Sequence, residues 1–435
     1  MLQTDLLEAL PLCAVFCVLG ILLLTRTREH HETVHFQVKL FLLAFVLRFA
    51  MSMALYEFGL LDVIKDEDAS GWINGLWLKQ VWERYAVGIL DLPAVLLEAF
   101  GLRHQGYVYM LASLFFVWDF GTPGRMVAAA LNCFLGALTV ILVYRTTRTL
   151  FDSAVAARVG WWTTLFPSLI IWSAQTIKEP VVIFLESVAL YCCVQMRRRG
   201  WSVKYALICL AAVVLLKPFR FYAMVITGAV AVLAAIPLSR ILPTLPIRTA
   251  VGVGGALLII TSLSGSGALS EEEGELVNLE YMAKYREGAA RFAQSGVETN
   301  YDLKTPAGFG MATLVGAAHV LFAPFPWQWA GGSLRLLLVV PEVIVWWWMF
   351  VKGVIPGLRL TLKTRYHDVE PILLFIVGFA LLYGMLFGNV GLAYRQRAQL
   401  LPSFFIFAAA WFEQLRAKRA ATQPAARSGT LAPAI

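Results

Sequence analysis

Long apolar runs separated by short polar breaks dominate the chain. Several runs approach or reach the roughly 20 residues that a helix needs to cross about 30 Å of hydrocarbon, and none shows the short alternation of a barrel strand. Because lipid leaves every backbone polar group to be satisfied internally, such runs predict transmembrane helices, and the predicted fold class is an all-α polytopic membrane protein. The eleven predicted spans lie near residues 6–25, 38–56, 125–145, 154–173, 180–196, 203–216, 221–238, 250–264, 334–351, 370–388 and 399–413.

Clusters of Lys and Arg fall in alternate breaks between the spans. The tendency of cations to stay in the cytoplasm then predicts an amino terminus outside and a carboxyl terminus inside. Two further apolar stretches, 105–118 and 307–324, would reverse this pattern if they crossed fully, and both are short or broken by Gly and Pro. We interpret them as re-entrant or interfacial. The outer face then carries two long segments, 57–124 and 265–333.

Residues 270–293 have helical periodicity and mixed charge, which predicts an amphipathic helix lying over the membrane. Three short outer turns are also predicted, with the sequences "QTIKEP", "KPFRF" and "YRQR". The chain carries no repeat and no separate soluble domain. We therefore predict one transmembrane domain over residues 1–415 and a disordered cytoplasmic tail over 416–435, rich in Ala, Pro, Thr and Ser.

Composition supports a membrane protein: 59% of residues are hydrophobic, 15% are charged, and the mean hydropathy is +0.70. The net charge of +8 does not indicate nucleic-acid binding, because most Lys and Arg residues lie in the breaks, where membrane topology explains them. All six cysteines fall inside predicted spans, at spacings that suit neither a metal site nor a disulfide framework.

Three consecutive acids, Asp66, Glu67 and Asp68, follow the second predicted span on the outer side. Carboxylates at this position can act as a general base or as metal ligands for a reaction at the membrane surface. The alternative is an ordinary solvated loop.

Five cations lie in the short outer turns, where the positive-inside tendency disfavours them. They are Lys178, Lys217, Arg220, Arg395 and Arg397. Arg binds phosphate through two parallel hydrogen bonds and Lys adds a compact charge, so a phosphate or pyrophosphate head group is the natural ligand. The alternative is that these side chains extend to lipid head groups. Five cations near an acidic stretch favour a functional site.

Arg48, Glu186 and Glu342 are ionisable residues inside predicted spans, where burial costs at least a few kcal/mol each. They fit a structural pair or a polar cavity wall as well as they fit chemistry. The solitary His104 and His319 are more typical of structural residues. No glycine-rich phosphate loop, metalloprotease helix motif or serine nucleophile elbow is present, so an enzyme built on this chain would need a donor activated within the lipid.

The order "DEDASGWINGLWLKQVW", followed by the stretch from "GYVYMLASLFFVWDFGTPGRM" to "WSAQTIKEP", resembles the amino-terminal half of GT-C membrane glycosyltransferases. The likeness is to protein mannosyltransferases and to the bacterial transferases that decorate lipid A. It covers roughly residues 38–240 and more loosely the rest, where "LFAPFPWQ" and "GNVGLAYRQRAQLLPSFFIFAAAW" resemble relatives from envelope polysaccharide synthesis.

This resemblance implies a sugar donor linked to polyprenyl phosphate, an envelope glycan, lipid or protein acceptor, and a catalytic acid in the first large outer loop. It also implies a location in the bacterial inner, or plasma, membrane. Asp68 stands four residues before Trp72, much as the family's acid precedes a Tyr, and Asp66 and Glu67 are adjacent candidates. By the same reading, a divalent metal such as Mg or Mn, if one is used, would bind Asp66 and Asp68.

The five outer cations would hold the donor phosphate, with Glu179 and Arg48 in support. Two alternatives stay open. One is a polymerase or ligase of lipid-linked glycans, which would depend more on Arg395 and Arg397 than on the acids. The other is a non-catalytic protein of envelope polysaccharide assembly or transport.

Overall fold

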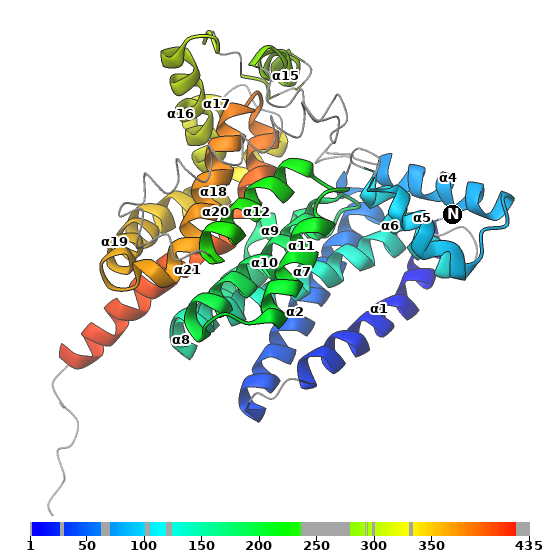
Figure 1. The fold of residues 1–435 in the computed structure, drawn as a ribbon, viewed down its shortest axis with the longest axis horizontal. Helices are drawn as coiled ribbons and strands as arrows, with labels where there is room; N and C mark the ends of the chain where they lie inside the picture. Colours follow the sequence, from blue (N-terminus) through cyan, green and yellow to red (C-terminus); the bar gives the residue numbers. More distant parts are fainter. Residues whose placement is uncertain are drawn as a thin grey trace, which may run out of the picture.

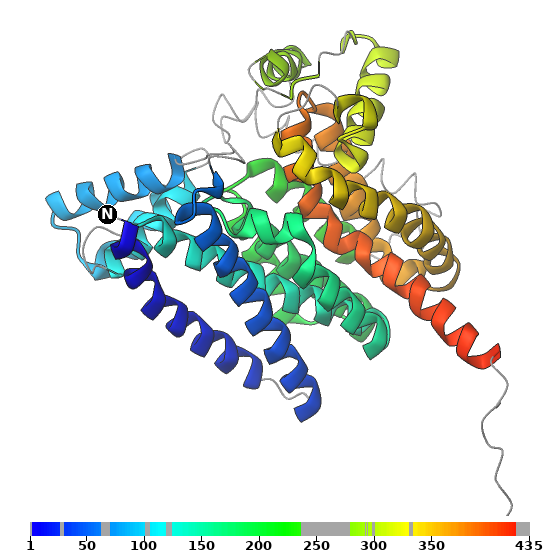
Figure 2. The same ribbon diagram turned by 180° about the vertical axis from the view of Figure 1, so that it is seen from behind.

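The computed structural model describes residues 2–26, 30–61, 70–100, 105–118, 124–235, 279–291, 293, 295–297, 301–329 and 334–422. Every regular element in these ranges is a helix, as the apolar runs predict (Figures 1 and 2). The longer helices form a bundle, and helices of the two predicted outer segments gather at one end of it. The candidate site lies at that end.

Six described helical segments are long and apolar enough to cross a membrane, which confirms a multi-pass membrane protein. Five of them are supplied by single helices: α1 (Leu2–Thr25), α2 (His31–Tyr56), α7 (Arg125–Leu150), α10 (Glu179–Arg199) and α20 (Tyr366–Met385). The sixth is formed by α18 (Leu334–Met349), the π-helical turn η3 (Phe350–Val354) and α19 (Ile355–Thr364), which follow one another without a break. α7 lies at the centre of the bundle, packed against α1, α2, α8 and α10. Small residues on its buried side let these neighbours approach closely.

A seventh span forms if α8 (Ser153–Leu165) and α9 (Pro167–Ser173) cross as one unit, bent by 56°. Pro167 causes the break, because its ring has no N–H to give to the carbonyl of Thr163 one turn earlier. Arg48 Nη2 of α2 donates to that carbonyl at 3.2 Å. The next backbone N–H, on Ser168, donates to Glu342 Oε2 of α18 at 2.8 Å. Two embedded charges therefore satisfy the peptide groups that the bend exposes.

Helices also form at two other predicted spans. α11 (Val203–Leu215) and α12 (Phe221–Ala235) have 13 and 15 described residues. At about 1.5 Å per residue these described residues reach about 20–23 Å, so they are not among the six segments long enough to cross a membrane. The predicted span at 250–264 lies outside the described residues. The last predicted span, 399–413, is part of the long helix α21 (Val390–Thr422).

Helices from the first outer segment cover one end of the bundle. They are α4 (Ser70–Arg84), the 3-10 turn η1 (Ile89–Asp91), α5 (Leu92–Glu98) and α6 (Gly106–Val117). α4 packs on α6 and both lie beside the end of α2 (Figures 1 and 2). The 12 residues of α6 are too few to span a bilayer, which agrees with the prediction for 105–118.

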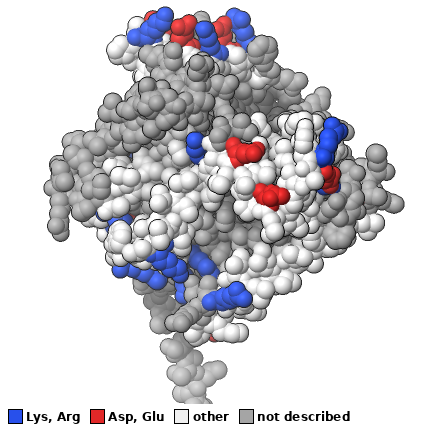
Figure 3. All heavy atoms as spheres, turned by 45° about the vertical axis from the view of Figure 1, so that its right-hand side comes forward, with Lys and Arg blue, Asp and Glu red and all other residues white. Residues whose placement is uncertain are grey.

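The second outer segment adds α15 (Leu279–Arg291), α16 (Pro306–Phe322) and α17 (Pro326–Trp329). α15 confirms a helix within the predicted amphipathic stretch, and Figure 3 shows acidic and basic side chains alternating at the top of the molecule, where this helix lies. Its inward-facing Arg286 donates to the carbonyls of Gly384 and Met385, at 3.2 and 2.9 Å. A cation thus satisfies the carbonyl end of α20.

The prediction of a turn at "YRQR" is wrong. Residues 394–397 belong to α21, which begins at Val390, after Asn389 Oδ1 accepts the N–H of Leu392 at 2.7 Å. The charged side chains do not end the helix because they find buried partners. α21 also includes residues 416–422 of the predicted tail, and residues 423–435 lie outside the described part of the chain.

Candidate functional site

A buried asparagine shapes the loop between α9 and α10. Asn132 of α7 is fully buried, and its Nδ2 lies 2.6 Å from the carbonyl oxygen of Gln175 and 2.8 Å from that of Ile177. A side-chain amide carries two N–H groups, which is enough to satisfy both carbonyls. The loop therefore has one fixed path, and Glu179 follows it as the first residue of α10.

The end of α2 holds the same loop from the other side. Ser52 Oγ donates to the carbonyl of Ala174 at 2.7 Å, and the N–H of Thr176 donates to the hydroxyl of Tyr56 at 2.9 Å. Buried backbone groups that keep such partners are stable, whereas unpaired ones cost about 1–3 kcal/mol each. The loop is thus a rigid support for the charged residues that follow it.

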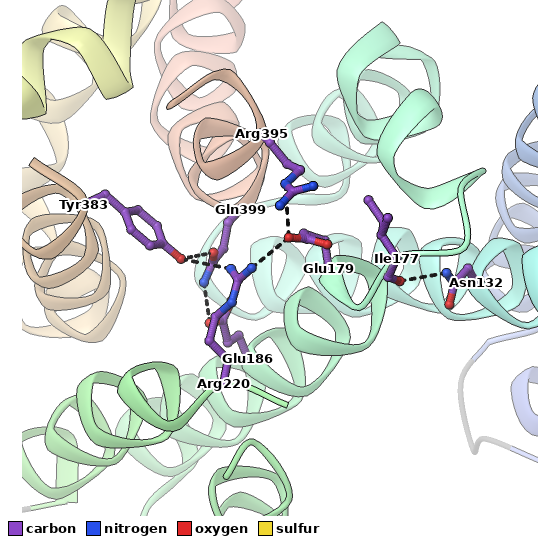
Figure 4. Close-up of polar contacts among 8 residues, drawn as sticks. All are labelled: Asn132, Ile177, Glu179, Glu186, Arg220, Tyr383, Arg395 and Gln399. Atoms are coloured by element: carbon purple, nitrogen blue, oxygen red, sulfur yellow. Dashed lines mark hydrogen bonds and ion pairs between the residues drawn. The ribbon is translucent and has the colours of Figure 1, made fainter. Parts of the chain in front are cut away.

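Two arginines contact the carboxylate of Glu179, as Figure 4 shows, and the charge of a neighbouring lysine also acts on it. Arg220 Nη2, from the turn between α11 and α12, lies 2.7 Å from Glu179 Oε1, and Arg395 Nε of α21 lies 3.2 Å from the same oxygen. The third cation, Lys178, directly precedes Glu179 in the chain. Glu179 and Arg220 are 4% and 5% exposed, so the ion pair is buried. We call these four residues the charged cluster.

A hydrogen-bonded chain continues from the charged cluster into the bundle. Arg220 Nη1 donates to the hydroxyl of Tyr383 at 3.4 Å, and this hydroxyl donates to Gln399 Oε1. Gln399 Nε2 then donates to Glu186 Oε1, one of the embedded acids identified in the sequence (Figure 4). The ring of Tyr222 lies 5.5 Å from the Arg220 guanidinium carbon, a distance typical of a cation–π contact.

The charged cluster has a net positive charge, since it combines one carboxylate with three cations. Its members come from three separate places in the chain, which is a costly arrangement unless the cations serve a purpose beyond stability. Guanidinium groups fixed in position by a shared carboxylate are well suited to bind phosphate. Lys217 lies in the same turn as Arg220, three residues before it.

The structure separates Arg397 from the charged cluster. Its Nη1 donates to the carbonyl of Ala323 at 2.8 Å, and its guanidinium carbon lies 4.9 Å from the Tyr394 ring. Residues two apart on a helix point in different directions, so Arg395 and Arg397 cannot meet the same group. The Tyr394 hydroxyl in turn donates to Glu342 Oε2 at 2.8 Å.

Arg48 also lies apart from the charged cluster. It is a buried residue of α2, and Nη1 donates to the carbonyl of Ala44 at 3.1 Å, in addition to the contact of Nη2 with Thr163.

The predicted catalytic acids Asp66, Glu67 and Asp68 lie outside the described residues, as does His104. The chain resumes with α4, whose first turn is close to the loop before Lys178. A Cβ built on Gly71 would lie 3.8 Å from the carbonyl oxygen of Thr176. The neighbouring Trp72 ring lies 5.0 Å from the Arg125 guanidinium carbon. The segment that follows the acids is therefore anchored beside the charged cluster.

Sequence reasoning missed the residues that connect the site. Asn132 could have been found as an amide inside the apolar run "AALNCFLG", and Gln399 as an amide in "RAQLLPSF". Nothing in the local sequence distinguishes Tyr383 from other aromatic residues of its span. Among the described residues, no group of three or more His, Cys, Asp or Glu side chains could hold a metal ion. A metal bound by Asp66 and Asp68 remains a prediction.

Comparisons of the chain with protein-family models, with curated proteins and with solved structures give no match.

Proposed function

We propose that this protein is a membrane glycosyltransferase that moves a sugar from a polyprenyl-phosphate donor to an envelope glycan, lipid or protein acceptor. The observation that carries this proposal is the charged cluster. Arg220 and Arg395 contact one carboxylate, and Lys178 precedes it in the chain, at the end of the bundle where α4 begins. A phosphate at the membrane surface is the ligand that such a cluster fits best.

In this proposal the three cations bind the donor phosphate and stabilise it as the leaving group. Glu179 keeps Arg220 and Arg395 in position, because both guanidinium groups contact its Oε1. Fixed charges of this kind favour the transition state, since they need no rearrangement when negative charge develops on the phosphate.

The acceptor hydroxyl would lose its proton to Asp68 or Asp66, with Glu67 as a further candidate. Its oxygen would attack the glycosyl carbon in line, the bond from that carbon to the phosphate oxygen would break, and the configuration would invert. The support for these acids is their place in the chain, directly before α4, whose Gly71 and Trp72 lie beside the loop that carries Lys178. A divalent metal at Asp66 and Asp68 would help to hold the donor phosphate.

The distribution of cations supports a site on the outer side of a bacterial inner membrane. Arg148 ends α7 and residues 197–199 end α10, at the end of the bundle away from the charged cluster. In Figure 3, Lys and Arg gather on the lower part of the molecule. The positive-inside rule would place that end in the cytoplasm, with the amino terminus outside.

The test is sugar transfer by the full-length protein in proteoliposomes, with a labelled polyprenyl-phosphate sugar and envelope acceptors. We expect Asp66→Asn and Asp68→Asn together to lower the transfer rate at least about 100-fold, the usual contribution of a general base. Glu57→Gln changes an acid of the same predicted outer segment and is expected to leave the rate unchanged. Transfer at the wild-type rate by the double variant would remove these acids from the mechanism.

A polymerase or ligase of lipid-linked glycans is the second candidate. The contacts of Arg220 and Arg395 favour it, because an anionic lipid carrier would bind this cluster whether or not the acids take part. In that case Arg395→Met would abolish bond formation and Asp68→Asn would not. Movement of a lipid-linked glycan across the proteoliposome membrane without a new glycosidic bond would instead indicate transport.

A further inference from the structure

A cavity lies inside the bundle between α2, α7, α8, α9, α10 and α21. Its lining includes Arg48, Gly136, Trp172, Ser173, Ala398 and Pro402. Arg48 is the only ionisable residue among the lining residues, which are otherwise apolar or carry hydroxyl groups. The cavity thus combines one positive charge with largely apolar walls.

The charge on Arg48 has no counter-charge among its described contacts. The residue is 2% exposed, its two Nη atoms donate to backbone carbonyls, and its Nε has no hydrogen-bond partner among the described residues. A buried carboxylic acid can become neutral by taking up a proton, but a guanidinium stays charged in proteins. Leaving such a charge uncompensated in a membrane costs at least a few kcal/mol. The site therefore calls for an anion.

A second buried N–H group without an acceptor belongs to another residue that lines the cavity. Trp172 lines the cavity, is 3% exposed, and its indole Nε1 has no acceptor in the described part of the chain. Gly136 lets Arg48 and Ser173 pack closely against α7, because a Cβ there would lie 2.8 Å from Arg48 Nε and 3.0 Å from Ser173 Oγ. Two residues that line the cavity thus carry buried N–H groups without an acceptor among the described residues.

We propose that this cavity binds a small monovalent inorganic anion of the chloride class, held by Arg48 Nε and Trp172 Nε1. A single negative charge matches the single guanidinium, whereas a divalent anion would leave a buried negative charge. A water molecule could accept the two hydrogen bonds but would not offset the charge. Apolar walls suit a halide better than a carboxylate or phosphate, whose several oxygens would each need a donor. The anion site does not depend on the proposed transfer reaction.

The experiment uses the full-length protein, purified in detergent and exchanged into sodium gluconate. Chloride is then added at constant ionic strength, and both the Tm and the binding of radioactive chloride are measured. We expect saturable binding of about one chloride per chain and a rise in Tm of about 2 °C or more at saturation. Trp172→Phe keeps the ring and removes the donor, and it should weaken chloride binding about tenfold.

Two variants remove the site by different routes. Arg48→Met deletes the charge, and Gly136→Ala keeps Arg48 but places a Cβ 2.8 Å from its Nε, which must then move, so each should lose saturable chloride binding. Arg359→Met changes an exposed arginine of α19 and should bind chloride as the wild type does. The proposal is overturned if the wild-type protein binds no chloride and melts at the same temperature in chloride and gluconate. It is equally overturned if Arg48→Met and Gly136→Ala bind chloride with wild-type affinity.

Discussion

The Glu179 carboxylate is expected to be the most costly single charge to remove from this protein. Glu179→Gln keeps the size of the side chain and one acceptor oxygen, but it leaves Arg220 and Arg395 without the anion they share at 2.7 and 3.2 Å. Breaking a buried ion pair by removing one partner costs about 3–5 kcal/mol. Coulomb's law gives a similar value, about 4 kcal/mol for one pair at about 4 Å and an effective dielectric constant near 20.

We expect Glu179→Gln to lower the free energy of unfolding by about 3 kcal/mol, the lower end of this range, because the amide oxygen still accepts a hydrogen bond. The assay is equilibrium unfolding in mixed micelles with increasing sodium dodecyl sulfate. The matched control is Glu280→Gln in α15, whose ion pair with Lys284 is exposed, at 65% and 73% for the two side chains. Loss of this pair should change stability by at most about 0.5 kcal/mol.

A double variant separates charge from packing. Arg220→Met combined with Glu179→Gln removes both partners of the pair, so it should destabilise by at least about 1 kcal/mol less than the sum of the single changes. The reasoning is refuted if Glu179→Gln is no more destabilising than Glu280→Gln, because Glu179 would then not act as the buried counter-charge.

Three further predictions concern the loop, the helix packing and the arginine geometry. Asn132→Leu should lower the unfolding free energy by about 2 kcal/mol or more, because two buried carbonyls lose their donor; an unchanged transition would contradict this role. Gly316→Ala should destabilise the protein strongly in the same assay, because the added Cβ would lie 2.1 Å from the carbonyl oxygen of Gly384. At Gly288 of α15 an added Cβ meets no atom within 4 Å, so Gly288→Ala should stabilise the protein by about 0.5–1 kcal/mol. Equal effects of the two substitutions would refute the packing argument. Under the proposed transfer, Arg395→Lys keeps the charge but loses the planar fork, so the transfer rate should fall at least about tenfold; an unchanged rate in proteoliposomes would argue against phosphate contact by this side chain.

Hydrophobic patterning was sufficient to predict the helical membrane fold, because a helix that faces lipid needs an apolar run of a certain length. α11 follows its predicted span, 203–216, closely, and α12 is described as far as Ala235. Patterning was less successful at charged residues inside a helix. Residues 394–397 were predicted as a turn because of their charge, but burial against Glu179 and backbone carbonyls lets them stay helical.

The candidate site was partly predictable for a similar reason. Lys178, Arg220 and Arg395 attract attention because cations are unusual at those positions, and the structure brings them together. Arg397 is also a cation at a position where cations are unusual, but its side chain points to the carbonyl of Ala323 instead. That direction depends on its position around the helix axis, which the sequence signal does not give. The link from Arg220 to Glu186 could not be predicted, since Tyr383 and Gln399 acquire their role only when α10, α20 and α21 pack together.

The bend at Pro167 has a consequence for the order in which the protein is assembled. Arg48, which contacts the Thr163 carbonyl, is synthesised before the bend, whereas Glu342, which contacts the Ser168 N–H, is synthesised long after it. During synthesis, α8 and α9 can therefore pack against α2 early, but the N–H of Ser168 has no partner until α18 has been synthesised. Packing of α18 thus completes a hydrogen bond whose two partners are separated by 174 of the 435 residues.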